Sequence, residues 1–197
     1  KIFGTKEKIF TGNSNFGQTL DYREPHEFGA FWRSQLCMDE MNQPDKVSNK
    51  QINWTNLKNT LQDISKVFSV PVVYKAFHLM WFIHEINKAL PDTKWIWITR
   101  NTVDNARSIL DLRRYLNNSI NTWASSKPIG IEKFCSGNPY LEVVAQVELV
   151  NQWIDSQLKK INKDNWLSFS LESLTASPIN TFETVANWSG IEVLEEK

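Results

Sequence analysis

The apolar run KWIWITR, residues 94–100, is the sequence feature that most constrains the fold. It is preceded by LMWFIHEINKAL at 79–90, an apolar stretch of helical length that Pro91 closes, and by the shorter apolar run VVYKAF at 72–77. Strand, helix and strand within about 30 residues predict a right-handed βαβ unit with parallel strands. We therefore expect an α/β fold built on a parallel sheet.

Further patterns extend this α/β arrangement on both sides. Leucine and isoleucine spacing predicts a helix from residue 55 up to Pro71, and a long amphipathic pattern predicts another from Tyr140 to Ile161. WLSFSLE, 166–172, is expected to form a third strand. SPINTFETVANWSGI, 177–191, has the features of a helix that begins at a serine cap with a proline in its first turn and stops at a glycine.

Composition limits the classes of function. The chain has 197 residues, of which 41% are hydrophobic, so we expect a single domain over residues 1–197. Its 22 basic and 22 acidic side chains give no general attraction for nucleic acid or an anionic membrane. Two cysteines and three histidines show no metal-like spacing, so no metal centre is expected. No stretch approaches the roughly 18 apolar residues of a membrane span.

Arg100 and Ser108 are candidate ligands of an anion. Arg100 ends a predicted strand, and open α/β sheets bind ligands at the carboxyl ends of their strands. Ser108 lies two turns into the following helical pattern, so a guanidinium and a hydroxyl can face one crevice, which suits a phosphate monoester. The same residues also fit plainer roles: an ion pair between Arg100 and Asp104, and a bond from the Ser108 hydroxyl back to its own helix.

The segment RNTVDNARS, residues 100–108, resembles the 3′-phosphate-binding segment of the sulfotransferases that use 3′-phosphoadenosine 5′-phosphosulfate (PAPS). That segment is commonly written R-[DN]-P-x-x-x-x-x-S, and here Thr102 replaces the proline. FSLESLTASP at 169–178 is similar to the family's YEDLxxxP element, and NWSGI resembles the stop of the helix that follows it. The resemblance spans roughly residues 22–191 and implies a three-layer, P-loop NTPase-like fold with a central parallel sheet flanked by helices.

The resemblance also implies a reaction, the transfer of a sulfuryl group from PAPS to a hydroxyl or amine acceptor by in-line displacement without a metal. YREPHEF, 22–28, looks like a segment of carbohydrate sulfotransferases, so a carbohydrate acceptor is favoured. The resemblance implies two catalytic residues: Glu24 as the base, and Lys75, which contacts the sulfuryl or bridging oxygens. It implies that Arg100 and Ser108 bind PAPS or its product PAP, and that Arg23 and His26 bind the acceptor.

Several of these roles have plainer alternatives. Lys75 in an apolar run is costly to bury without a partner, but it would cost little at an exposed sheet edge. Glu24 could form an ordinary surface pair with Arg23. His78 lies one residue beyond the place where cytosolic small-molecule sulfotransferases have a histidine, which points it to the opposite face of a strand and predicts a structural role.

The family's phosphate loop, of the kind PRSGTT or PKSGTT, does not occur in the sequence. GNSNFGQT, 12–19, has the spacing of a GxxxxGK[ST] loop, but Gln18 stands where lysine is required. We expect the loop upstream of residue 1 or outside the residues given, in preference to a degenerate family member. Two other hypotheses remain: a non-catalytic sulfotransferase-like module that binds a nucleotide or a partner, and a P-loop small-molecule kinase, for which no Walker lysine is evident.

The partner expected is a small-molecule or glycan acceptor, with no nucleic acid and no membrane. A cytoplasmic, bacterial-type protein is favoured. A protein of the Golgi lumen is the alternative, and it would imply that an upstream membrane anchor was removed from the chain.

Overall fold

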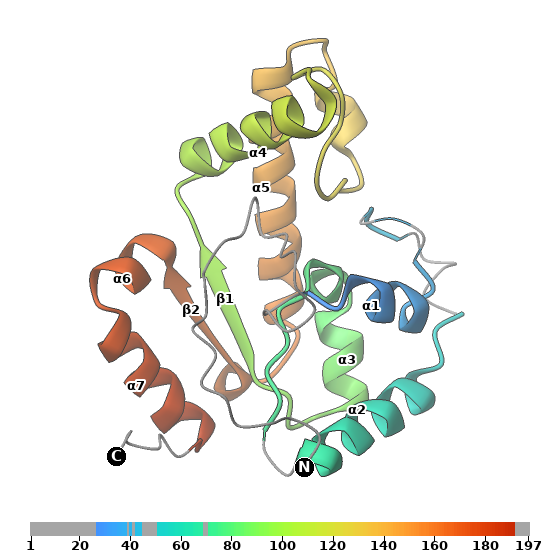
Figure 1. Ribbon diagram of the computed structural model, residues 1–197, viewed down its shortest axis with the longest axis vertical. Coiled ribbons are helices and arrows are strands. Elements are labelled where there is room, and N and C mark those ends of the chain that lie inside the picture. Colours follow the sequence, from blue (N-terminus) through green and yellow to red (C-terminus); the bar gives the residue numbers. More distant parts are fainter. Residues whose placement is uncertain (1–26, 39, 41, 45–50, 69–70, 192–197) are drawn as a thin grey trace, which may run out of the picture.

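The computed structural model describes residues 27–38, 40, 42–44, 51–68 and 71–191 (Figure 1). Within these residues the chain is mixed α/β, with seven α-helices and a two-stranded parallel sheet. The elements in order are α1 (Gly29–Gln35), α2 (Trp54–Phe68), the 3₁₀-helix η2 (Phe77–Trp81), α3 (Ile83–Ala89), β1 (Trp95–Thr99), α4 (Thr102–Asn117), η3 (Ile131–Phe134), α5 (Pro139–Leu158), η4 (Lys163–Asn165), β2 (Trp166–Ser170), α6 (Leu171–Ala176) and α7 (Pro178–Ser189).

The local patterns place most helices and both strands correctly. α2, α5 and α7 form where periodicity and end signals predict them, and β1 follows the predicted strand to within a residue. β2 is two residues shorter than expected, because the Ser170 side chain accepts a hydrogen bond from the Ser173 amide and starts α6 there. α7 ends at Gly190, whose φ of 71° is the left-handed conformation that glycine adopts without strain.

The prediction of a βαβ unit over residues 72–100 is wrong. Residues 71–76 are extended, with Ala76 at φ −152° and ψ 123°, but they form no ladder with any strand of the described chain. A strand is stabilised by hydrogen bonds to a neighbour, so an apolar run without one stays an isolated extended segment. Phe77 then begins η2, and α3 covers only Ile83–Ala89 of the helix predicted at 79–90.

The parallel partner of β1 is β2, from much later in the chain. Trp95 lies opposite Trp166, and Thr99 lies opposite Ser170. The connection between the strands contains both α4 and α5, which pack together around the buried side chains of Ala106, Leu110, Val143 and Val147.

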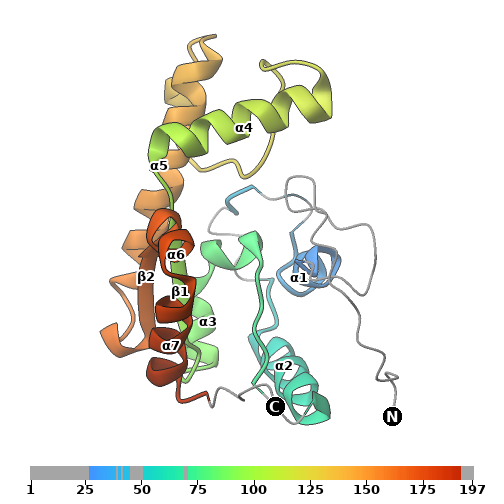
Figure 2. The same ribbon diagram turned by 60° about the vertical axis from the view of Figure 1, so that its left-hand side comes forward.

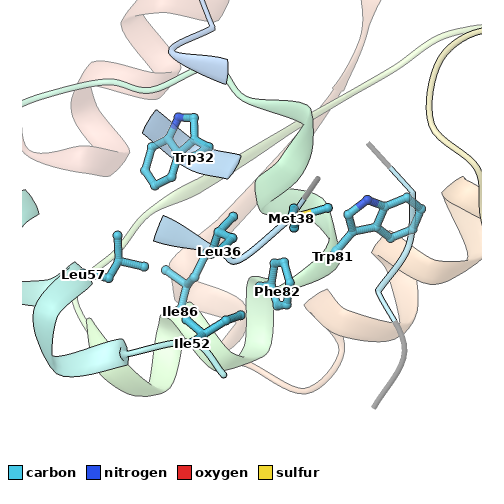
Figure 3. Packing of buried hydrophobic residues seen from close by; sticks show 8 residues of the cluster. All are labelled: Trp32, Leu36, Met38, Ile52, Leu57, Trp81, Phe82 and Ile86. Atoms are coloured by element: carbon cyan, nitrogen blue, oxygen red, sulfur yellow. The ribbon is translucent and has the colours of Figure 1, made fainter. Parts of the chain in front are cut away.

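A second buried cluster joins the amino-terminal helices to the rest of the chain. Its side chains come from α1, α2, η2, α3 and the segments beside them (Figure 3): Trp32, Leu36, Met38, Ile52, Leu57, Trp81, Phe82 and Ile86. Trp95 of β1 and Trp153 of α5 pack against it, and the Trp153 indole N–H donates to the Met80 carbonyl at 3.1 Å. The cluster therefore fixes the sheet and α5 against the helices that precede them.

The strands separate two sets of helices. Trp95 faces the cluster on the side of α3 and α5, whereas α6 and α7 lie on the other side of the strand pair (Figures 1 and 2). Ile96 and Ile98 alternate with the tryptophans of β1 and remain 43% and 51% exposed. The face of β1 opposite α3 and α5 is thus only partly covered.

A buried cation holds the connection between α4 and α5. Arg113 is completely buried, and its guanidinium forms an ion pair with Glu142 at 2.7 Å. It also donates to the Ile120 carbonyl at 3.2 Å and to the Gln146 side chain at 3.3 Å. The Gln146 amide in turn donates to two carbonyls of the connecting segment, those of Ala124 and Ser126.

Candidate functional site

The candidate site lies at the carboxyl ends of β1 and β2. Because the strands are parallel and Thr99 lies opposite Ser170, both strands end at the same edge of the sheet. Arg100 follows β1 directly, and α6 begins directly after β2. The structure thus places Arg100 at the edge where the sequence predicts it.

α4 begins at Thr102, and Asn101, the residue after Arg100, caps it with its side chain. The Asn101 side-chain oxygen accepts hydrogen bonds from the amides of Val103 at 3.0 Å and Asp104 at 3.3 Å. Asparagine is among the best residues for this position, because its short side chain reaches the amides that a helix start leaves unpaired. The Thr102 hydroxyl donates to Glu148 of α5 at 2.7 Å, so the start of α4 is fixed on two sides.

Arg100 has an exposed side chain, and no carboxylate of the described residues forms an ion pair with it. Asp104, the partner that the plainer interpretation would give it, pairs instead with Arg107 at 3.5 Å. Arg100 is therefore not neutralised by Asp104 of the helix that follows it. A guanidinium left in this state at a strand end is available to bind an anionic ligand.

Ser108 lies on the side of α4 that faces away from α5. Ala106, Leu110 and Arg113 form the buried face of the helix. Ser108 follows Asn101 by seven residues, so the two lie within about 20° of each other around the helix axis and opposite that buried face. Ser108 is about 9 Å along the axis from the start of the helix, which keeps its hydroxyl within range of a group bound to Arg100.

The Ser108 hydroxyl does not bond back to its own helix. Other helical hydroxyls do so: that of Ser189 donates to the Val185 carbonyl at 2.7 Å, and that of Thr184 donates to the Asn180 carbonyl at 2.7 Å. For Ser108 no such bond is found within the described part of the chain. Its half-buried hydroxyl is therefore free to bind a ligand.

Lys75 is exposed and pairs with Glu27, an acid for which the sequence predicts no role. Its ammonium lies 2.5 Å from the Glu27 carboxylate and 5.2 Å from the centre of the Phe77 ring. The Lys75 side chain is 68% exposed, so burial does not fix its position. No hydrogen bond or ion pair within the described residues joins it to Arg100 or Ser108.

Glu24, Arg23 and His26, the predicted base and acceptor-binding residues, lie outside the described residues. Glu27 belongs to the same YREPHEF segment, three residues after Glu24. The signal for it was thus present in the sequence as a second glutamate, but its pairing with Lys75 depends on a contact across 48 positions.

His78 is buried in η2 and is 3% exposed, as expected for a residue with a structural role. Burial lowers the pKa of its imidazole, the positive charge of Arg33 lowers the pKa further, and the negative charge of Glu27 opposes both effects. An added Cβ at Gly29 would lie 3.8 Å from the ring, so α1 packs closely over it. His78 is therefore held neutral near pH 7.

Glu172 places a carboxylate at the predicted anion site. Its carboxylate accepts a hydrogen bond from the Asn101 amide at 3.2 Å. The pKa of Glu172 is lowered, first by hydrogen bonds from its own amide and from that of Asn101, and also by the Ser170 side chain and the positive charge of Arg100. Glu172 is therefore ionised at neutral pH and lies beside Arg100.

No group of three or more histidine, cysteine, aspartate or glutamate side chains in the described part of the chain could hold a metal ion. In the same residues, no helix has the length and apolar character needed to cross a membrane. No protein-family model, curated protein or solved structure matches the chain.

Proposed function

We propose that the chain is a PAPS-dependent sulfotransferase, or the nucleotide-binding bulk of one, which transfers a sulfuryl group to a hydroxyl or amine acceptor, with a carbohydrate favoured. One observation supports this most strongly. Arg100 stands exposed at the carboxyl edge of the parallel strands, where no described carboxylate forms an ion pair with it, and Ser108 lies on the matching side of α4 with a hydroxyl that bonds to no other described residue.

The start of α4 favours side-chain recognition of the anion. The amides of Val103 and Asp104 already bond to the Asn101 side chain, and the Asn101 amide bonds to Glu172. An incoming phosphate would thus gain its contacts from Arg100 and Ser108. A guanidinium makes two parallel hydrogen bonds to a phosphate monoester, and the 3′-phosphate is the group that distinguishes PAPS and PAP from common adenine nucleotides.

In the proposed reaction the acceptor oxygen attacks the sulfur of PAPS, the bond from sulfur to the 5′-phosphate oxygen breaks, and the acceptor proton passes to Glu24. Lys75 would stabilise the negative charge on the transferred group and the leaving oxygen, while Arg23 and His26 contact the acceptor. The pair of Lys75 with Glu27 does not prevent this role. The Lys75 side chain is 68% exposed, so water screens its attraction to the less exposed Glu27 carboxylate, and the pair contributes about 1 kcal/mol and exchanges readily.

The proposal includes the three-layer fold of this family. Residues 71–76 run in the same direction as β1 and apart from it (Figures 1 and 2). Val73 in that segment is 81% exposed, and Ile96 and Ile98 on β1 are about half exposed. A further parallel strand between the two, followed by a helix over the isoleucines, would cover this apolar surface. In the family that strand and helix flank the phosphate loop.

The test is calorimetric binding of adenosine 3′,5′-bisphosphate compared with adenosine 5′-monophosphate. Arg100→Ala should remove the preference for the 3′-phosphate, since losing a charge-assisted contact costs about 2 kcal/mol, or roughly 30-fold in affinity. The matched control is Arg107→Ala, which removes an exposed arginine of α4 that pairs with Asp104. Equal affinity of the wild-type protein for both nucleotides would contradict the proposal.

A non-catalytic module that binds the same nucleotide is the second candidate, because no PRSGTT-type string occurs in the 197 residues. Mass spectrometry of acceptor mixtures incubated with PAPS distinguishes the two candidates. Sulfated products that depend on Lys75 support the enzyme, whereas 3′-phosphate-specific binding without products supports the module.

A further inference from the structure

Glu172 links the two segments that leave the candidate site. Its carboxylate belongs to the first turn of α6, after β2, and it accepts the amide hydrogen of Asn101, after β1. Arg100 is the residue immediately before Asn101, so a carboxylate is fixed by a backbone hydrogen bond beside the guanidinium that would bind phosphate. The positive charge of Arg100 is one of the causes that lower the pKa of Glu172 and keep its carboxylate ionised.

The charges around the start of α4 do not by themselves favour an anion. Arg100 and Arg107 supply two positive charges. Asp104, Glu148 and Glu172 supply three negative ones, and each of these three carboxylates bonds to a residue between 101 and 107. The local sum is one negative charge. A phosphate dianion that binds Arg100 must therefore do so against nearby carboxylates, of which Glu172 bonds to the amide of the residue next to Arg100 and is acted on by the Arg100 charge.

We propose that Glu172 sets the affinity of this site for its anion: the fixed carboxylate repels the phosphate bound at Arg100, offsets part of the guanidinium's attraction, and weakens binding of the 3′-phosphate. The proposal rests on the proposed function, because that function supplies the phosphate. The repulsion persists when the nucleotide is bound, since the Asn101 amide keeps the carboxylate in place. Weaker binding of PAP speeds its release after transfer, and product release often limits enzyme turnover.

The decisive variant is Glu172→Gln. A glutamine oxygen still accepts the Asn101 amide hydrogen, so the contact remains while the charge is lost. For a phosphate about 7 Å from the carboxylate in a water-like dielectric, the relief of repulsion tightens binding of adenosine 3′,5′-bisphosphate by roughly three- to sevenfold. Binding of adenosine 5′-monophosphate should not change. Glu172→Asp keeps the charge and should not tighten binding.

The matched control is Glu183→Gln, which removes an exposed carboxylate from α7 and should leave both affinities unchanged. If Glu183→Gln tightens binding as much as Glu172→Gln, the effect is one of net charge and the inference is overturned. A second outcome also overturns the inference: the wild-type protein prefers the 3′-phosphate, but Glu172→Gln binds adenosine 3′,5′-bisphosphate no more tightly than the wild type does. In that case the proposed function stands.

Inorganic sulfate provides a probe that does not depend on the nucleotide. Its affinity is measured from thermal unfolding of four proteins: wild type, Glu172→Gln, Arg100→Ala and the double variant. We expect Glu172→Gln to strengthen sulfate binding in the wild-type background and to have little effect without Arg100. That result supports the proposed effect of Glu172 on anion binding at Arg100 even if the protein shows no preference for a 3′-phosphate, in which case only the proposed function fails. Equal effects of Glu172→Gln with and without Arg100 contradict the proposed role of Glu172.

Discussion

Replacing the buried Arg113 should be among the most destabilising single changes in the described chain. The guanidinium is completely buried, pairs with Glu142 at 2.7 Å, and lies 4.8 Å from the centre of the Trp123 ring. At an effective dielectric near 20, charges about 4 Å apart attract by about 4 kcal/mol. Arg113→Met keeps much of the volume but leaves Glu142 without its partner, which costs about 3–5 kcal/mol for a buried pair.

The assay is urea unfolding followed by circular dichroism, with Arg114→Met as the matched control. Arg114 is the next residue on α4 and pairs with Asp111, but its side chain is 53% exposed, so its loss should cost less than about 1 kcal/mol. The double variant Arg113→Met, Glu142→Met should be more stable than Arg113→Met alone, because it leaves no uncompensated carboxylate. If the two arginine variants are equally stable, the account of Arg113 as a buried anchor is wrong.

Two other predictions concern the residues around η2. Because burial lowers the pKa of His78 below its ordinary value of 6.5, the unfolded chain takes up this proton at a higher pH than the folded chain. The free energy of unfolding should therefore fall as the pH drops below about 6.5. Denaturant titrations at several pH values measure this dependence, and His78→Asn should make the fall with pH less steep. An unchanged pH dependence in the variant would contradict the prediction. Lys75→Met should change stability by less than about 1 kcal/mol and keep the 3′-phosphate preference, but slow sulfuryl transfer in a coupled assay; an unchanged transfer rate would exclude the catalytic role.

The sequence predicts those features of the site that depend on local signals. β1 follows from the apolar run KWIWITR, and the helix that follows it starts at an asparagine, a residue of high capping preference. These two signals together place Arg100 between a strand end and a helix start. The position of Ser108 then follows from the helical period alone.

Strand pairing could not be predicted from the same signals. KWIWITR and VVYKAF lie close together in the chain, which favours pairing them. β1 instead pairs with β2, and Trp95 and Trp166 are separated by 71 positions. An apolar run shows that a segment prefers to be buried, but the choice of its neighbour depends on the packing of the whole chain. The same limit applies to the ion pair of Lys75 with Glu27, which spans 48 positions.

The burial of Arg113 could be predicted from its position on the helix, although the composition of the segment suggests an exposed side chain. Residues 94–133 contain seven basic and three acidic side chains, and a modest basic excess of this kind is typical of a solvated surface. The spacing of Arg113, seven residues from Ala106 and three from Leu110, places it on the buried stripe of α4, whereas Arg114 lies outside that stripe. A helical wheel of this segment therefore separates the anchoring arginine from the exposed one.

The central claim is that Arg100 recognises a phosphate at the 3′ position of an adenine nucleotide. The most direct measurement compares the affinities of adenosine 3′,5′-bisphosphate and its 2′,5′ isomer for the wild-type protein and Arg100→Ala. The isomers carry the same charge, so general electrostatic attraction cancels in the comparison. The account predicts that the wild-type protein prefers the 3′,5′ isomer and that Arg100→Ala binds both equally. Equal affinity of the wild-type protein for the two isomers would contradict it.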